Sequence, residues 1–457
     1  MNRYWETCQM PGNLNSVLTE QERIATLAQR SPDFAFYSLA HHIDLQWLLE
    51  AYDRTRKDGA AGIDEVTGKQ YAENLYDNLQ NLLERVKTGK YKAPPVKRVH
   101  IPKGTGKETR PIGIPAFEDK VLQRAVVMLM EPIYEHDFYD GSYGFRPRRS
   151  AHQALEDVWK TTMDMAGGWV LEVDIRKFFD TLEHKHLQEF VSRRVRDGVI
   201  RRLIGKWLNA GVMEDGNVKY TESGTPQGGV ISPLLANIYL HYVLDEWFEK
   251  EVKPVMRSRG RLIRYADDFV IIFQQKYDAE RVMAVIPKRF GKYGLTVHPE
   301  KTELVDFRSP YHYERRRKEE SSDDERGGGK PGTFDLLGFT HYWGKTRKGG
   351  QAVKRKTMKS RIARSIRSID QWCSKNRHMP VREQWRKLCE KVRGHYGFYG
   401  ITGNNRAIGN FLYQVRCSWQ RWLNRRNNRH DTTWERFNLL LARYPLPIPK
   451  IVHSVFQ

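Results

Sequence analysis

Two adjacent aspartates interrupt an otherwise apolar segment, and they constrain the fold of this region more than any other feature. RLIRYADDFVIIF (261–273) is typical of two short strands joined by a tight polar turn at Ala266–Asp268. Neighbouring carboxylates at a hairpin tip repel one another, and Arg264 is the basic partner at hand in the local sequence. A cation would relieve this repulsion, and hard carboxylate oxygens suit Mg²⁺. Because Asp is also common in turns, a plain surface turn is the alternative interpretation.

A third carboxylate stands at the end of another expected strand. WVLEVDI (169–175) alternates apolar and polar residues, which predicts a half-buried strand ending near Asp174. If that strand lies beside the hairpin, the three carboxylates can bind two metal ions about 3.5–4 Å apart, as polymerases do for phosphoryl transfer.

The positive charge of the chain is concentrated near its C-terminus. The chain has a net charge of +22, and residues 351–457 hold 23 Lys and Arg against 5 Asp and Glu. Such a region requires a polyanion as its partner, and the candidates are nucleic acid or an anionic membrane surface. The basic residues alternate with Trp and Tyr, which suits base stacking, so we expect nucleic acid and no membrane.

Composition narrows the class further. A length of 457 residues with 39% apolar residues predicts two to four folded domains. No apolar run reaches the roughly 18 residues needed to span a bilayer, and the first residues lack the pattern of a signal peptide. The four cysteines form no C-x-x-C pair, which favours an intracellular, reducing environment without a zinc site. We therefore expect a cytoplasmic protein.

The order of the periodic patterns indicates an α+β fold followed by a helical domain. Residues 35–57 and 70–88 have helical apolar spacing, and FDLLGFTHYW (334–343) suggests a strand pair. From residue 357 onward the pattern is helical, with Arg361, Arg364 and Arg367 expected on the solvent side. Residues 308–333 include a charged and then glycine-rich stretch, which predicts a mobile insertion.

Seven sequence boxes in order resemble those of the reverse transcriptases encoded by bacterial group II introns, which also act as maturases. YADD resembles the catalytic box, and the residues from 357 to 457 resemble that family's thumb and maturase domain. The ordered boxes are KRVHIPKGTGKETRPIGIP (97–115), SYGFRPRRSAHQAL (142–155), VLEVDIRKFFDTLEH (170–184), GTPQGGVISPLLANIYL (224–240), YADD (265–268), GLTVHPEKTELV (294–305) and FDLLGFTHYW (334–343).

The resemblance implies a right-hand polymerase with three parts and no endonuclease domain. The N-terminal extension and fingers would occupy residues 1–165, the palm with its antiparallel sheet residues 166–345, and the thumb and maturase domain residues 346–457. Members of the family that carry an endonuclease domain have a C-terminal Cys and His cluster, which this sequence lacks.

The resemblance also implies roles for individual residues. Asp174, Asp267 and Asp268 would be catalytic and would bind two Mg²⁺ ions, with Mn²⁺ as a possible substitute. Among the residues expected to contact the nucleotide, Phe179 would exclude the ribose 2′-hydroxyl. A second group of residues is expected to contact the primer and template, and a third group is expected to bind RNA phosphates. The nucleotide group is Lys103, Arg110, Phe179 and Gln227; the primer and template group is Tyr265, Gly228 and Lys301; the RNA group is Arg421, Arg425, Arg426 and Arg429.

The function implied is an RNA-directed DNA polymerase that binds its group II intron RNA, assists splicing and reverse-transcribes that RNA. Its partners would be the structured RNA, an RNA template with a DNA primer, dNTPs and a DNA target. Two alternatives stay open: a splicing-only RNA-binding maturase, and a related reverse transcriptase recruited to another task such as phage defence.

Overall fold

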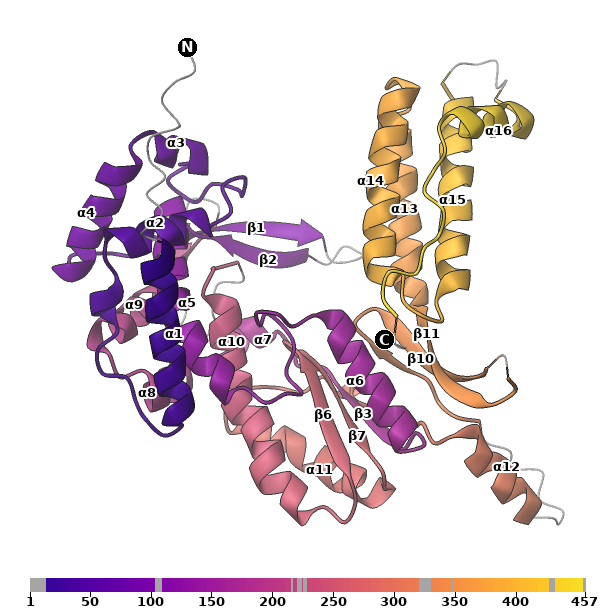
Figure 1. Ribbon diagram of the computed structural model, residues 1–457, viewed down its shortest axis with the longest axis horizontal. Helices are drawn as coiled ribbons and strands as arrows, with labels where there is room; N and C mark the ends of the chain where they lie inside the picture. The colour runs from indigo at the N-terminus through magenta and orange to yellow at the C-terminus, as the bar shows by residue number, and fades with distance from the viewer. Residues whose placement is uncertain are drawn as a thin grey trace.

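A four-stranded antiparallel sheet carries the three aspartates at one end. The computed structural model describes residues 14–102, 109–214, 217–219, 224, 228–319, 330–346, 348–426 and 432–454 (Figure 1). Within them the strand order is β6-β7-β3-β8, and every neighbouring pair is antiparallel. These strands are β3 (Trp169–Val173), β6 (Gly260–Tyr265), β7 (Asp268–Phe273) and β8 (Glu303–Asp306).

Both faces of this sheet are covered. Leu171 and Ile271 belong to the main apolar core, whereas Val170 and Ile272 face a second cluster with α6 (Ala151–Asp164). The prediction of a half-buried strand at 169–175 was therefore wrong. The strand is buried on both sides because further strands and α6 cover the second face, which a single period-two segment cannot reveal.

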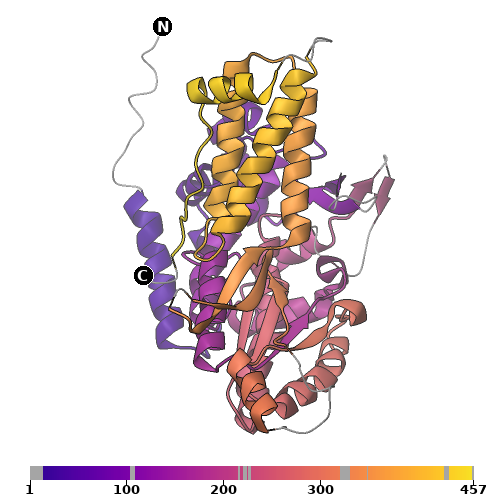
Figure 2. The same cartoon turned by 90° about the vertical axis from the view of Figure 1, so that its right-hand side faces the viewer.

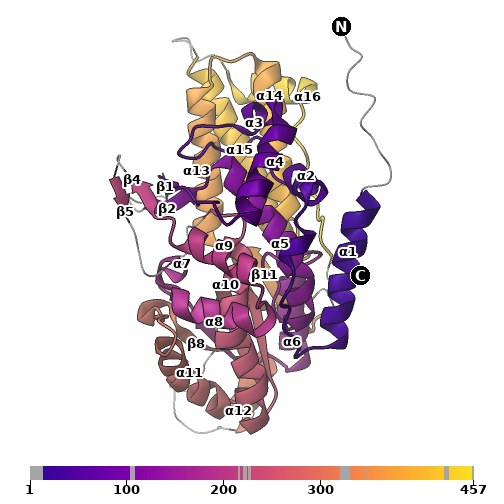
Figure 3. The same ribbon diagram turned by 90° about the vertical axis from the view of Figure 1, so that its left-hand side faces the viewer.

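Helices from the first half of the chain build one side of the main core. The long α5 (Phe117–Asp137) is buried over most of its middle turns, and Val121, Leu129 and Ile133 are fully buried. Gln21 Nε2 on α1 donates to the Met128 carbonyl at 2.8 Å, and α1 lies along α5 (Figure 3). The other helices here are α1 (Leu14–Arg30), η1 (Ala40–His42), α2 (Leu45–Asp53), α3 (Gly68–Glu73), α4 (Leu75–Lys87), α7 (Phe178–Thr181), α8 (His184–Arg194) and α9 (Gly198–Leu208).

The helices expected at 35–57 and 70–88 are both shorter than the apolar spacing suggested. Phe36 instead bridges to Val195, and α2 begins only after Asp44, whose side chain caps it through the Trp47 N–H. The second segment is divided at Asn74 into α3 and α4. Gly89 follows α4 with a φ of 74°, which glycine adopts without strain.

A second sheet projects from these helices. Its order is β2-β1-β4-β5, and the long β1–β2 hairpin extends toward the C-terminal helices (Figure 1). Ile101 and Arg110 are paired near the tip of the hairpin. The strands are β1 (Val96–Pro102), β2 (Thr109–Ile114), β4 (Val212–Glu214) and β5 (Asn217–Lys219).

A continuous helical segment with two π-helical turns follows. It starts as α10 (Ser232–Leu240) and continues through the π-helix η2 (His241–Asp245), the π-helix η3 (Phe248–Val252) and the 3-10 turn η4 (Lys253–Val255). Beyond the β6–β7 hairpin come α11 (Lys276–Gly291), η5 (Pro299–Lys301) and α12 (Pro310–Glu319). The insertion expected at 308–333 thus begins with a helix, and residues 320–329 lie outside the described part.

The C-terminal helices have a core of their own. Ile369, Leu388, Val415 and Phe437 belong to a cluster separate from the main core, and these helices stand together above the sheet in Figure 2. A three-stranded sheet, β11-β10-β9, leads into them, so the boundary expected at 345/346 falls within the β10–β11 hairpin. The elements are β9 (Phe334–Leu336), β10 (Phe339–Lys345), β11 (Gln351–Thr357), α13 (Lys359–Lys375), α14 (Val381–Tyr399), α15 (Asn405–Asn424) and α16 (Trp434–Arg443).

Candidate active site

The β6–β7 hairpin has the geometry expected from its sequence. Tyr265 at the end of β6 pairs with Asp268 at the start of β7, so Ala266 and Asp267 form a two-residue turn. Ala266 has a φ of 57°, in the left-handed region, and is buried. A residue other than glycine in this conformation is held there by its surroundings. The turn therefore presents Asp267 and Asp268 at the edge of the sheet in a fixed orientation.

Strand pairing brings Asp174 to the same edge. Val173 is opposite Phe269, and one more step in this register places Asp174 opposite Asp268. The backbone of Asp174 is held by the His298 N–H, which donates to its carbonyl at 2.8 Å. Its carboxylate accepts from Lys301 Nζ, with 3.0 Å between Nζ and Oδ2. Three carboxylates from two strands and one turn thus gather at one end of the sheet.

The electrostatics of this edge favour the capture of cations. Desolvation, together with the nearby charges of Asp267 and Asp174, raises the pKa of Asp268 to about 6. Desolvation also raises the pKa of Asp267. Asp268 is itself exposed, so water reaches the carboxylate even though protein atoms crowd it. The charges of Arg110 and Arg361 act in the opposite direction on Asp268 but do not restore its usual pKa.

The donor chemistry of this edge fits divalent metal ions. Within the ranges that the structure describes, no three His, Cys, Asp or Glu side chains are arranged so that they could already hold a metal ion. The Asp174 carboxylate is turned to the Lys301 ammonium, which offsets part of its charge. Carboxylates that repel one another at a water-accessible edge are the hard oxygen donors that Mg²⁺ and similar ions prefer. Asp174, Asp267 and Asp268 are accordingly the residues that would bind such ions.

Comparison with known proteins agrees with this geometry. The model of the family described as reverse transcriptase (RNA-dependent DNA polymerase) matches residues 101–341, just over half of the chain. The chain belongs to the reverse transcriptase family. This confirms the resemblance drawn from the ordered boxes, and it makes divalent metal ions and nucleic acid the ordinary requirements of the site.

Individual relatives of this reverse transcriptase are similar over part of their length. It is 38% identical over 286 residues to protein YkfC of Escherichia coli, covering 55% of this chain and 74% of that protein. It is 35% identical over 275 residues to the group II intron-encoded protein LtrA of Lactococcus lactis, covering 58% and 41% of the two chains. It is 30% identical over 182 residues to the protein of Arabidopsis thaliana named nuclear intron maturase 2, mitochondrial, covering 31% of this chain and 24% of that protein.

The structure places several of the expected substrate residues near the aspartates. Arg110 lies on β2, exposed, and is close enough to influence the pKa of both Asp267 and Asp268. Tyr265 is half-buried, with its ring centroid 6.3 Å from that of Phe145. Phe179 is half-buried on α7 and packs edge-on against Phe178 at 5.3 Å. Lys103, Gln227 and Arg429 lie outside the described residues.

Gly228 has a reason for lacking a side chain that the sequence did not reveal. Its φ is 125°, and a Cβ there would lie 2.5 Å from the carbonyl oxygen of Gly113 and 2.9 Å from Ile112 Cγ2. The close approach in the structure is thus to the protein's own strand β2. This contact ties the segment after residue 227 to the strand that carries Arg110.

The expected RNA-binding arginines of the last helices have different environments. Arg421 forms an ion pair with Asp370 at 3.2 Å, and Arg425 is exposed, with its guanidinium over the ring of Trp422 at 5.1 Å. Arg426 is half-buried and donates to the carbonyl oxygens of Arg377 and Met379. Its charge is therefore engaged in closing the loop between α13 and α14.

Two arginines, Arg361 and Arg264, have contacts in the structure that the sequence did not reveal. Arg361, Arg364 and Arg367 are exposed, as expected for the solvent side of α13, but the first of them also influences the Asp268 carboxylate. Arg264, interpreted as the local basic partner of the aspartate pair, does act through its charge against the rise in the pKa of Asp267, but its side chain is fully buried and paired with Asp245. The spacing of the α13 arginines indicates their exposure but not the effect of Arg361 on Asp268, and no sequence signal links Arg264 to Asp245.

Removal of one carboxylate should stabilise the protein in the absence of divalent ions. We expect Asp268→Asn to raise the melting temperature at pH 7.5 in EDTA by on the order of 1–3 °C, because it relieves repulsion within the site. Adding MgCl₂ should raise the melting temperature of the wild type more than that of the variant. Calorimetric scans of both proteins with and without Mg²⁺ measure this. An equal Mg²⁺ response in the two proteins would contradict a role of Asp268 in binding the ion.

Among the described residues, no helix combines the length and apolar character needed to cross a membrane.

Proposed function

We propose that this reverse transcriptase binds a structured group II intron RNA, assists its splicing and copies it into DNA. The observation that carries the proposal is the gathering of Asp174, Asp267 and Asp268 at one end of the sheet, in a chain similar to the group II intron-encoded protein LtrA. Its partners in this proposal are the intron RNA, an RNA template with a DNA primer, dNTPs and a DNA target. It acts in the cytoplasm and on nucleoid DNA.

In this proposal each residue group has a defined part in nucleotide addition. Asp174, Asp267 and Asp268 hold two Mg²⁺ ions, for which Mn²⁺ can substitute. The ions, when bound, favour deprotonation of the primer 3′-hydroxyl and neutralise charge on the leaving pyrophosphate. Arg110, with Lys103 and Gln227, binds the incoming nucleotide, since a guanidinium offers two parallel donors to a phosphate. Tyr265, Gly228 and Lys301 face primer and template, and Lys301 must release Asp174 when an ion binds.

The arrangement of the elements supports a right-hand polymerase. We assign residues 1–165 to an N-terminal extension and fingers, 166–345 to the palm and 346–457 to the thumb and maturase domain. The β1–β2 hairpin on one side and the base of α13 on the other both contribute an arginine whose charge acts on Asp268. A substrate between them would meet positive charge from two directions, which suits the phosphates of a duplex and a triphosphate.

The first test separates chemistry from binding. Asp267→Ala should abolish extension of a DNA primer on an RNA template, while the affinity for the primer–template stays within about threefold, because the carboxylate acts on the transition state. Primer extension and fluorescence anisotropy measure the two quantities. The same variant should still assist splicing of the intron RNA. Wild-type protein that assists splicing but never extends a primer would instead be a splicing-only maturase.

The second test addresses sugar selection by Phe179. We expect Phe179→Val to accept ribonucleotides more readily, because a smaller side chain leaves room for the 2′-hydroxyl. The ratio of kcat/KM for dNTP to that for the matching rNTP should fall by about 10-fold or more, or ~1.4 kcal/mol of discrimination. Phe178→Val, which alters the fully packed neighbour, serves as the control and should leave this ratio unchanged. An undiminished ratio in Phe179→Val would show that Phe179 is ordinary core.

The third test concerns RNA binding by the C-terminal helices. Exposed arginines there should make phosphate contacts and release counterions, so RNA affinity should fall steeply with salt. We expect the triple change Arg364→Gln, Arg367→Gln and Arg425→Gln to weaken intron binding and to flatten the log–log salt slope by up to about one unit per lost contact. Arg426 is left intact because its charge closes a loop.

A matched variant controls for net charge. Lys69→Gln, Lys87→Gln and Lys90→Gln remove the same charge from exposed positions around α3 and α4. Filter-binding titrations over a salt series should show a smaller effect for this control. Equal slopes and affinities for both triple variants would contradict a specific RNA-binding role for the C-terminal helices.

A further inference from the structure

We propose that Arg264, Asp245 and Asn237 form a buried positioning device that holds the catalytic turn in place. The inference rests on the proposed polymerase function and extends it to residues that do not touch substrate. Arg264 immediately precedes Tyr265, and its backbone lies in β6. Its side chain runs back into the protein interior, away from the site, and is wholly inaccessible to solvent.

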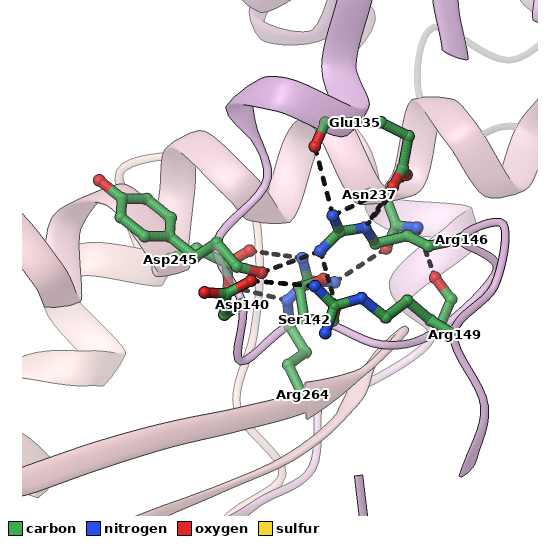
Figure 4. Close-up of polar contacts among 10 residues, drawn as sticks. Glu135, Asp140, Ser142, Arg146, Arg149, Asn237, Asp245 and Arg264 are labelled. Atoms are coloured by element: carbon green, nitrogen blue, oxygen red, sulfur yellow. Dashed lines mark hydrogen bonds and ion pairs between the residues drawn. The ribbon is translucent and has the colours of Figure 1, made fainter. Parts of the chain in front are cut away.

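Every hydrogen bond of this guanidinium is directed to a fixed group. Nε donates to Asp245 Oδ1 at 2.8 Å and Nη2 to Asp245 Oδ2 at 2.5 Å, a two-point contact that fixes orientation (Figure 4). Nη1 donates to Asn237 Oδ1 at 2.9 Å and to the carbonyl oxygen of Ala266 at 3.1 Å. That last bond grips the residue with the left-handed φ, directly before Asp267. The arginine thus joins the helix behind the sheet to the turn that presents both aspartates.

The π-helical turn explains how one helix supplies both acceptors. Asn237 and Asp245 are eight residues apart, which on a regular α-helix would leave their side chains roughly 80° apart around the axis. The segment from His241 to Asp245 is π-helical, and its wider turn reduces that offset. Both side chains consequently reach the same guanidinium. Such π-helical turns are uncommon and are frequently found at functional sites.

A loop from a distant part of the sequence braces the turn from behind. The Tyr143 N–H donates to the Arg264 carbonyl and the Arg264 N–H to the Gly141 carbonyl, both at 2.8 Å. Asn237 Nδ2 donates to the Gly144 carbonyl at 2.7 Å. A Cβ on Gly144 would lie only 2.3 Å from the Ala266 nitrogen, so the loop backbone presses against the turn itself. Asn237 therefore links the loop, the arginine and the turn.

The same loop has its own buried anchor. Arg146 is almost inaccessible, forms an ion pair with Glu135 at 3.1 Å and donates to the Tyr139 and Ser142 carbonyl oxygens at 2.9 and 2.8 Å (Figure 4). Arg149 forms a more exposed pair with Asp140 at 2.9 Å. The loop is thus fixed to α5 before it reaches the catalytic turn.

Stability alone gives little reason to retain such a network. A buried ion pair pays a large desolvation cost, and replacing it with well-packed apolar side chains is often neutral or stabilising. Arg264 donates to the Ala266 carbonyl while its other donors are held by Asp245 and Asn237, which are both buried on the α10–η2 helical segment. Misplacement of catalytic groups by about 1 Å can cost on the order of 100-fold in rate. Precise placement of the turn is thus the benefit that the network supplies.

The decisive variant removes the device without leaving a buried charge. Arg264→Met combined with Asp245→Leu replaces the pair by apolar side chains, and we expect a melting temperature near that of the wild type. Primer–template affinity should be unchanged within about twofold, whereas kcat for dNTP addition should fall by on the order of 100-fold with little change in KM. Arg264→Lys keeps the charge and one donor and should recover part of kcat. A double variant with near-normal kcat would overturn the proposal.

A remote buried pair provides the matched control. Arg194 and Asp137 pair at 2.8 Å beside the N-terminal helices, and the same replacement there should leave kcat within about twofold. Mn²⁺ affinity of the free protein, measured by electron paramagnetic resonance, gives a readout that needs no turnover. It should weaken several-fold in the Arg264 and Asp245 double variant and stay unchanged in the control. Equal Mn²⁺ affinities in the wild type and in the Arg264 and Asp245 double variant would overturn the positioning role. A wild type that binds Mn²⁺ yet extends no primer would contradict only the proposed polymerase function.

Discussion

Repulsion among Asp174, Asp267 and Asp268 is the constraint around which the four-stranded sheet β6-β7-β3-β8 is built. Like charges near one another at a protein surface repel, and water at the exposed Asp268 screens part of that repulsion. Burial of one Leu, Ile or Phe side chain contributes about 1.5–3 kcal/mol, and the strands that end at these aspartates bury several such residues on both faces. The apolar pairing of β3, β6 and β7 thus outweighs the repulsion and fixes the carboxylates near one another before any cation arrives.

The cations supplied by the protein offset this charge only in part, and they come from separate elements. Arg110 lies on the projecting hairpin, Lys301 on the turn before β8 and Arg361 at the start of α13. Of these three cations, Lys301 is the one for which the described contacts include a direct ion pair with Asp174, Asp267 or Asp268. Its Nζ lies 3.0 Å from Asp174 Oδ2. The pKa of Asp268 still stands at about 6. This end of the sheet has concentrated negative charge and separate positive groups around it. Such an arrangement suits the joint binding of metal ions and phosphates better than the binding of metal ions alone or of phosphates alone.

Which parts of the fold could be predicted from the sequence depends on how far apart in sequence the interacting residues are. The hairpin at 261–273 and the strand pair at 334–343 were predicted correctly, because period-two patterns and turn residues act locally. The break of the first expected helix before Asp44 was missed, since it depends on a bridge from Phe36 to Val195. The partner of Arg264 was also missed, because Asp245 is buried beside it through helix packing rather than sequence spacing.

The candidate site follows the same rule. Its three carboxylates were singled out from the polar turn and the strand pattern, the ordered boxes then implied their role, and strand register explains why they meet. The environment of Gly228 follows from contact with β2, more than 100 residues away in sequence, and no local pattern carries that information. The same holds for Arg361, whose spacing on α13 indicates exposure but not which surface it faces. Charge count predicted a nucleic-acid partner for the last helices, yet only the fold reveals that Arg426 is committed to a loop.

The attachment of α13 connects the basic helices to the chemistry. These helices have their own core, so they could in principle be positioned independently of the sheet. Their start is nevertheless held, because the Met358 N–H donates to the Gly338 carbonyl at 3.0 Å and Arg361 packs beside the same glycine. The chain after α16 returns to this same end of the helices, where the His453 ring stacks on His152 of α6 at 3.4 Å. An RNA bound along α13 would accordingly be placed at a set distance from Asp268, and a shift of the helices would have to break these contacts first.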